Sequence, residues 1–123
     1  SYKTYESAQV FFKKNDEKYK IYFVSGALFD KNINIKNCKK KDEIAEEISK
    51  SIKDVKINDE GIRNHPTDKS GKSINTAARV NLKSGDVISI HCNDYSKEHG
   101  GQDHLAVNLR TAEYTKFLRI AYK

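Results

Sequence analysis

Residues 86–110 read DVISIHCNDYSKEHGGQDHLAVNLR, and this stretch decides the expected fold. Apolar and polar residues alternate over 86–93 and again over 104–110, and a segment with two glycines lies between the two runs. Alternation with a period of two is typical of a β-strand that buries one face, and the glycines favour a reversal of the chain. The stretch therefore predicts an antiparallel β-hairpin.

Segments on either side of the hairpin extend the same pattern. ARVNL at 78–82 is followed by the turn sequence KSGD, and TKFLRIAY at 115–122 follows the short segment TAEY. Together with the hairpin they predict a four-strand antiparallel meander that fills residues 78–123. The apolar run IYFV makes 20–24 the candidate for a fifth strand.

Helices are expected toward the N-terminus. The sequence KKDEIAEEISKSIKDV at 40–55 repeats isoleucine every four residues, and its acidic residues come first, as the helix dipole favours. Residues 5–18 predict a further helix, and the polar, proline-containing stretch 58–77 predicts a long loop. The fold class is therefore α+β, with N-terminal helices packed on a C-terminal antiparallel β-sheet.

Length and composition indicate one domain over 1–123, with a helical and mixed region over 1–57. The chain is 37% hydrophobic and 33% charged, and its 123 residues can bury a core without a metal or a disulfide. No apolar run approaches the ~20 residues that cross a bilayer, so a soluble protein without a transmembrane segment is expected. The chain begins at Ser1, has no methionine and ends in a strand-like sequence, which suggests a domain excised from the C-terminal end of a longer protein.

The net charge of +6 comes from 23 Lys and Arg residues against 17 Asp and Glu residues. A basic surface attracts polyanions, with nucleic acid first and anionic membranes second. The alternative is a composition rich in Lys and Asn that comes from an AT-rich genome, which would raise the isoelectric point without any partner. Both explanations stay open at this point.

Two cysteines, Cys38 and Cys92, are too few and too far apart in sequence for a zinc ribbon or knuckle. Bonded to each other, they would close a long loop and stabilise the fold by ~4 kcal/mol. Free, buried thiols are the favoured interpretation. The alternation over 86–93 turns Cys92 toward the core.

The polar face of the hairpin gathers groups that can move protons. His91 and His104 are expected across from each other on this face, with Arg110 further along it. Cleavage of RNA without a metal needs a base for the 2′-hydroxyl proton, an acid for the leaving 5′-oxygen and a cation for the phosphorane. Histidine suits both proton transfers because its pKa lies near neutrality. These three residues are the predicted catalytic groups, and no cofactor is expected.

Polar and aromatic side chains around the hairpin are candidates for binding the substrate, and a tyrosine there can stack on a base. The full set is Ser89, Asn108, Tyr95, Lys97, Arg119, His99, His65 and Lys72. A metal site is a weaker alternative, because the ligand spacing matches no standard zinc pattern. Its ligands would come from His91, Asp94, His99, Asp103 and His104. For any single histidine, a surface or structural role is the common alternative.

N-terminal helices, a C-terminal antiparallel sheet and a basic surface together resemble the small ribonuclease toxin domains of bacteria. Such domains form the C-terminal ends of contact-dependent inhibition proteins, related polymorphic toxins and tRNA-cleaving colicins. The residues that carry the resemblance are His91, His104 and Arg110, within SIHCND and DHLAVNLR. The resemblance implies metal-independent cleavage of RNA, tRNA first, and a cognate acidic immunity protein. It also implies a protein that is secreted or delivered and acts in the cytoplasm of a target cell.

Two other classes of function fit the same sequence. A non-catalytic basic module that binds nucleic acid or protein would use the polar face without needing paired histidines. A secreted effector domain with a Cys38–Cys92 disulfide is the third class. Alanine at His91 and His104 would leave a binding module largely intact, and a change of mass on reduction would support the disulfide-bonded domain. Salt dependence does not separate an enzyme from a binder, because phosphate contacts dominate both.

Overall fold

The computed structural model describes residues 7–12, 21–29, 31–35 and 38–121. Within them the strands are β1 (Ser7–Phe12), β2 (Ile21–Leu28), β3 (Lys56–Asn64), β4 (Ile74–Asn81), β5 (Val87–Asp94) and β6 (His104–Arg110). The helices are α1 (Lys39–Ser51) and α2 (Ala112–Ala121). The α+β class predicted from the sequence is confirmed.

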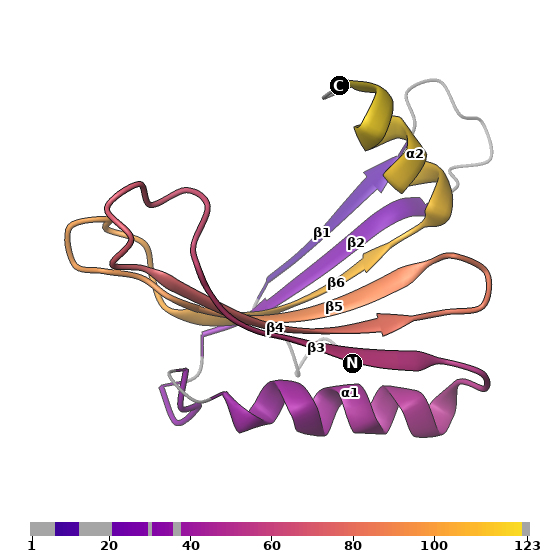
Figure 1. Cartoon of the computed structure of the whole chain (residues 1–123), viewed down its shortest axis with the longest axis horizontal. Coiled ribbons are helices and arrows are strands. Elements are labelled where there is room, and N and C mark those ends of the chain that lie inside the picture. The colour runs from indigo at the N-terminus through magenta and orange to yellow at the C-terminus, as the bar shows by residue number, and fades with distance from the viewer. Residues whose placement is uncertain (1–6, 13–20, 30, 36–37, 122–123) are drawn as a thin grey trace.

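All six strands join one antiparallel sheet in the order β1-β2-β6-β5-β4-β3. Strands β3 to β6 form a meander, and the β1–β2 hairpin extends the sheet by pairing β2 with β6 (Figure 1). The predicted hairpin is confirmed as β5 and β6, and the predicted strand at 20–24 lies largely within β2. The meander begins one strand earlier than predicted, at β3.

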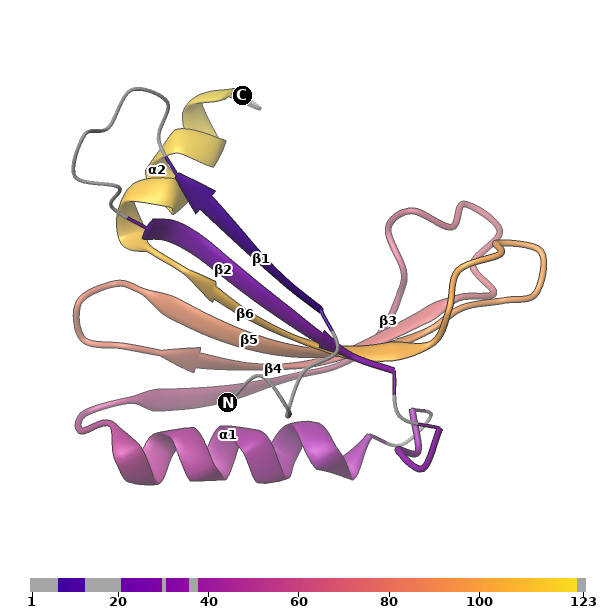
Figure 2. The same cartoon turned by 180° about the vertical axis from the view of Figure 1, so that it is seen from behind.

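Helix α1 covers one face of the sheet, and the core lies between them. Ile90 and Leu105, on β5 and β6, are fully buried and pack with Ala45 of α1. Figures 1 and 2 show α1 running along this face and α2 on the opposite side, where β6 ends. Tyr114 of α2 packs against Phe23 of β2, with ring centroids 5.4 Å apart. We call the sheet surface turned away from α1 the open face.

Helix α1 forms where the sequence predicts it, because its apolar side chains fall on one side. Ile44 and Ile48 pack against the core cluster around the fully buried Ala45. The helix begins after Cys38, whose φ of 44° lies in the left-handed region. Lys41 is buried on the sheet side, where its ammonium group lies 3.0 Å from Asp42 and 3.8 Å from Asp59. A buried charge is costly without partners of this kind.

Two elements predicted before residue 78 are wrong. The helix expected over 5–18 is replaced by β1 at residues 7–12, and the rest of that range lies outside the described residues. The long loop expected over 58–77 contains most of β3 and the start of β4, which leaves 65–73 as the connection. Most of β3 is exposed, because β3 is the outermost strand of the sheet. An edge strand with little to bury lacks the apolar alternation by which strands are recognised.

The strand expected over 115–122 is also wrong, because residues 112–121 form α2, while residue 122 lies outside the described residues. The signal for a helix is present just before it: the Thr111 hydroxyl accepts a hydrogen bond from the Tyr114 amide at 3.2 Å, which caps the helix. Glu113 follows in the first turn and Arg119 in the last, where each charge suits the helix dipole. The apparent alternation in TKFLRIAY hid a helical repeat of partly buried residues.

A disulfide joins Cys38 to Cys92, which corrects the expectation of free thiols. The two Cα atoms lie 6.3 Å apart, and 54 positions separate the residues in sequence. Both side chains are fully buried in the core, as the alternation predicted for Cys92. The bond fastens the N-terminal end of α1 to β5, directly beneath the open face.

In the part of the chain that the structure describes, neither helix is long and apolar enough to cross a membrane.

Reduction of the disulfide is expected to destabilise the fold by about 4 kcal/mol, because the unfolded chain regains the freedom of a long loop. Urea denaturation with and without a reducing agent measures the difference in the free energy of unfolding. The Cys38→Ala, Cys92→Ala double variant is the control, since the reductant has nothing to cleave in it. Equal stability of the parent chain with and without reductant would contradict the disulfide.

Candidate functional site

A concave pocket of about 640 Å³ opens on the open face of the sheet. Three of the four histidines of the chain contribute to its wall. The residues that line it are Phe23, Ser25, Arg63, Asn64, His65, Pro66, Asn75, His91, Asn93, His104, Ala106 and Asn108. We call it the histidine pocket.

The hairpin β5–β6 places His91 and His104 on the open face, as its alternation predicts. His91 pairs with Ala106 in the sheet, and Asn93 pairs with His104. The two histidines are therefore diagonal neighbours and do not face each other directly, which corrects the expected register. Diagonal side chains on adjacent strands start roughly 7–8 Å apart, so a small group can lie between the two imidazoles.

Asparagine amides connect the two histidines. The amide group of Asn75 lies 3.3–3.4 Å from Nδ1 of His91, and its Nδ2 donates to Oδ1 of Asn93 at 2.6 Å. Nδ2 of Asn93 in turn lies 3.3 Å from Nε2 of His104. Nδ1 of His104 donates to the carbonyl oxygen of Gln102 at 2.9 Å, which leaves Nε2 as the acceptor toward Asn93. This row of side chains fixes the orientation of both rings.

The other two histidines gather around Tyr95, at the start of the connection between β5 and β6. The Tyr95 ring stacks on His99 with centroids 4.7 Å apart, and its hydroxyl oxygen lies 3.2 Å from Nε2 of His65. The Tyr95 ring also lies 5.9 Å from that of His104. The Thr67 hydroxyl lies between His65 and His99, at 2.9 Å and 3.1 Å from their ring nitrogens. His65 therefore reaches the histidine pocket, whereas His99 stays on its exposed outer side.

Asp68 holds the two loops that carry these histidines. Its carboxylate accepts hydrogen bonds from the hydroxyl groups of Ser70 and Ser73 in its own loop, and from that of Ser96 in the loop 95–103. The Ser96 amide also donates to the Ser73 hydroxyl at 2.8 Å. These donors hold the pKa of Asp68 well below its usual range, so the carboxylate stays charged and the connection persists in mild acid.

A β-bulge brings Arg63 into the pocket. The pairing of β3 with β4 shifts between Asp59 and Gly61, where Gly61 has a φ of +69°. Before the bulge, Asp59 pairs with Ala78 on the α1 side, and after it Arg63 pairs with Asn75 on the open face. A bulge of one residue exchanges the faces of all the side chains that follow it. Without it, Arg63 would point away from the histidines.

Charges around His91 act together with burial to lower its pKa. Burial has the largest effect, and the guanidinium groups of Arg63 and Arg79 lower the pKa further, while the Glu60 carboxylate raises it. Glu60 is paired with both arginines: Oε1 lies 2.8 Å from Nε of Arg79, and Oε2 accepts from Arg63. Burial and the neighbouring His99 and His104 also lower the pKa of His65. Both imidazoles are therefore neutral at pH 7 and can accept protons.

The remaining predicted residues lie outside the histidine pocket, apart from Asn108, which lines it and accepts a hydrogen bond from Ser25 at 2.5 Å. Arg110 pairs with Phe23 and Val87, six residues along β6 from His104, or roughly 20 Å. Ser89 pairs with Asn108 on the open face, and Arg119 is exposed on α2. Lys72 forms an ion pair with Glu98 at 3.1 Å. Tyr95 and Lys97 line a second pocket. The arginine that lines the histidine pocket is Arg63 and not Arg110. The sequence analysis missed Arg63 because it predicted a loop where β3 forms.

The histidines and carboxylates weighed as a metal site do not converge. Among the described residues, no three His, Cys, Asp or Glu side chains are grouped closely enough to hold a metal ion. Asp103 instead accepts a hydrogen bond from the Tyr95 amide at 2.8 Å, and His104 is held by Gln102. Asp103 and His104 therefore stabilise the loop 95–103.

The pKa of His91 is expected to lie below the ordinary value of 6.5, and Glu60→Gln should lower it further by removing the carboxylate that favours the charged ring. A titration followed by NMR of the imidazole protons measures both values, with the exposed helix residue substituted as Glu47→Gln for the control. A midpoint at or above 6.5 would contradict the burial of His91. The folded chain protonates His91 less readily than the unfolded chain does. The free energy of unfolding should therefore decrease as the pH falls below about 6.5.

Comparisons with protein-family models, curated proteins and solved structures found no match to this chain. No relative therefore contributes a substrate, a cofactor or a residue role to this site. What the pocket can do follows from its own groups: neutral imidazoles, a guanidinium group and a row of amides around a space of about 640 Å³.

Proposed function

We propose that the chain is a metal-independent endoribonuclease that cleaves RNA, with tRNA as the favoured substrate, by general acid–base transphosphorylation. One observation carries this proposal: His65, His91, His104 and Arg63 line a single pocket on the open face of a chain with a net charge of +6. RNA supplies its own nucleophile, the 2′-hydroxyl group, so the protein needs only groups that move protons and stabilise charge.

His91 suits the role of the general base. Its lowered pKa keeps the imidazole neutral at pH 7, and Asn75 orients the ring through Nδ1. In the proposed step His91 takes the proton of the 2′-hydroxyl group as the 2′-oxygen forms a bond to phosphorus. The bond from phosphorus to the 5′-oxygen breaks, and the products are a 2′,3′-cyclic phosphate and a free 5′-hydroxyl group.

His104 is the proposed general acid. In this role it carries a proton on Nε2 as well as on Nδ1, and the Nε2–H group turns from Asn93 to the leaving 5′-oxygen and gives it the proton. Attack and departure occur in line on opposite sides of phosphorus, so the two imidazoles must flank the phosphate. The diagonal placement of His91 and His104, roughly 7–8 Å apart at the sheet, supports this arrangement. His65 is the alternative base, because it lines the same pocket from the loop 65–73 and its lowered pKa keeps the imidazole neutral.

Arg63 is the cation proposed to stabilise the phosphorane. Its side chain is 57% exposed, so it can turn from Glu60 toward a phosphate. A guanidinium group donates two parallel hydrogen bonds to phosphate oxygens. Asn108 and the amides of Asn64 and Asn75 add neutral donors around the same space.

A role as a toxin domain, with delivery into a target cell and an acidic immunity protein as partner, extends this proposal. The α+β architecture and the basic composition support it, and they support a non-catalytic RNA-binding module equally well. An acidic partner would have to cover Arg63 and the histidines to block both activities. The presence of three histidines in one pocket favours the enzyme over the binding module.

Incubation with total tRNA in EDTA should give fragments with 2′,3′-cyclic phosphate ends. His91→Gln and His104→Gln should each lower the cleavage rate at least about 100-fold, the usual contribution of a general base or acid. Arg63→Ala should lower the rate as well, whereas Lys50→Ala, which removes the same charge from α1 on the far side of the sheet, should not. Gel electrophoresis of end-labelled tRNA measures the rates.

Thermal unfolding of each variant shows whether a lost rate reflects a lost fold. Cleavage that persists in both histidine variants would move the chemistry to His65. A parent chain that binds tRNA in EDTA without cutting it would contradict the ribonuclease and establish the binding module.

A further inference from the structure

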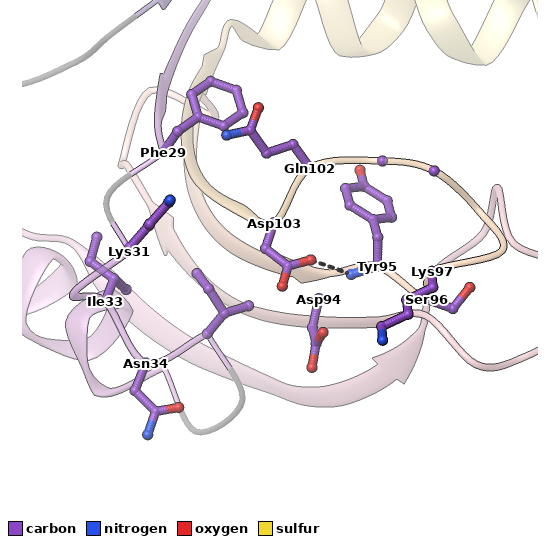
Figure 3. Close-up of a pocket in the computed structure, with 13 residues that line it drawn as sticks. Phe29, Lys31, Ile33, Asn34, Asp94, Tyr95, Ser96, Lys97, Gln102 and Asp103 are labelled. Atoms are coloured by element: carbon purple, nitrogen blue, oxygen red, sulfur yellow. Dashed lines mark hydrogen bonds between the residues drawn. The ribbon is translucent and has the colours of Figure 1, made fainter.

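A second pocket of about 650 Å³ lies at the loop end of the sheet, and the proposed chemistry leaves it unused (Figure 3). The segment after β2 and the loop between β5 and β6 form its walls. Its lining residues are Phe29, Lys31, Ile33, Asn34, Ile35, Asp94, Tyr95, Ser96, Lys97, Gly100, Gly101, Gln102 and Asp103. We call it the loop pocket.

Aromatic rings separate the loop pocket from the histidine pocket. Phe29 and Tyr95 line the loop pocket, and each packs against His104, with ring centroids 5.1 Å and 5.9 Å apart. His104 itself lines the histidine pocket. If an RNA strand binds with a phosphate beside His104, the next base along the strand can therefore reach the loop pocket.

The loop pocket combines two cations with two carboxylates. Lys31 and Lys97 are exposed and lie at its rim, where they can meet the phosphates of a bound strand. Oδ1 of Asp103 accepts a hydrogen bond from the Tyr95 amide at 2.8 Å. Figure 3 shows the Asp103 carboxylate between Phe29 and Asp94. Among the described residues nothing hydrogen-bonds to the Asp94 carboxylate, although its side chain is partly buried.

An unused carboxylate in an RNA-binding pocket selects one base. A carboxylate presents two acceptors side by side, and N1–H with the 2-amino group of guanine presents two donors side by side. Adenine, cytosine and uracil do not offer two adjacent donors on one edge. A guanine whose edge faces Asp94 therefore satisfies this carboxylate where the other bases leave it unpaired.

Glycines make room for the loop over this pocket. Gly100 has a φ of +76°, which favours glycine, and a Cβ added to Gly101 would come within 2.8 Å of the Tyr95 ring. The backbone at Gly101 therefore lies directly against the ring and holds it in the wall. A side chain there would displace Tyr95 from both the loop pocket and His104.

We propose that the loop pocket is a guanine subsite, in which Asp94 pairs with the base and Lys31 and Lys97 contact the phosphates. This inference rests on the proposed RNA substrate, and it adds that substrate's base preference. It predicts that tRNA is cut preferentially beside guanine.

Titration of the ¹⁵N-labelled chain with 5′-GMP, followed by NMR, tests the subsite without any cleavage step. We expect shifts in the amide signals of Tyr95, Lys97 and Gly101, with affinity at least about tenfold higher for GMP than for IMP, which lacks the 2-amino group. Asp94→Asn should remove this preference, and Asp54→Asn, an exposed Asp after α1, should keep it. His91→Gln should also keep it, because the histidine pocket is separate.

Equal binding of GMP, IMP and AMP, or unchanged GMP binding in Asp94→Asn, would overturn the guanine subsite. Absence of binding up to about 10 mM GMP would overturn it too. Specific GMP binding by a chain that does not cut tRNA would keep the subsite and remove the ribonuclease. Cleavage of tRNA without preference for guanine would keep the ribonuclease and remove the guanine subsite.

Discussion

The alternation of side chains along β5 and β6 is the constraint on which the rest of the structure depends. Ile90, Cys92 and Leu105 are buried against α1, so every second residue between them must emerge on the open face. His91 and His104 therefore cannot leave that face without exposing the core. The disulfide from Cys92 to the start of α1 fixes the same choice covalently. The core thus determines which groups a ligand can meet.

Sequence patterns predict the elements that bury an apolar face and miss those that do not. The hairpin β5–β6 and helix α1 have strong periodicity, and both form near the expected residues. Edge strand β3 is mostly exposed, so its polar sequence resembles a loop. Helix α2 was missed because Leu118 and Ile120 suggest the alternation of a strand, although Ile120 is exposed. The elements that were predicted differ from those that were missed in how much apolar surface they bury, and not in the secondary-structure propensity of their residues.

The candidate site shows the same division. Both hairpin histidines and Asn108 could be placed from alternation, because the hairpin alone positions them. His65 and Arg63 could not, since they reach the pocket through the sheet order, the bulge in β3 and the Asp68 network between loops. Their sequence neighbours give no sign of this. Arg110 has the right residue type on the right face, but it lies too far along the strand, which alternation does not measure.

The bulge in β3 has a second effect, on how the protein behaves at high concentration. Among the strands that the structure describes, none pairs with the outer edge of β3, so the backbone amides and carbonyls along this edge can be reached by another chain. The irregular pairing around Gly61 and the charged neighbours Asp59, Glu60 and Arg63 interrupt that edge. A regular strand from a second molecule would lose hydrogen bonds there and bury charge. The same irregularity that directs Arg63 toward a ligand therefore discourages aggregation by edge-to-edge strand addition.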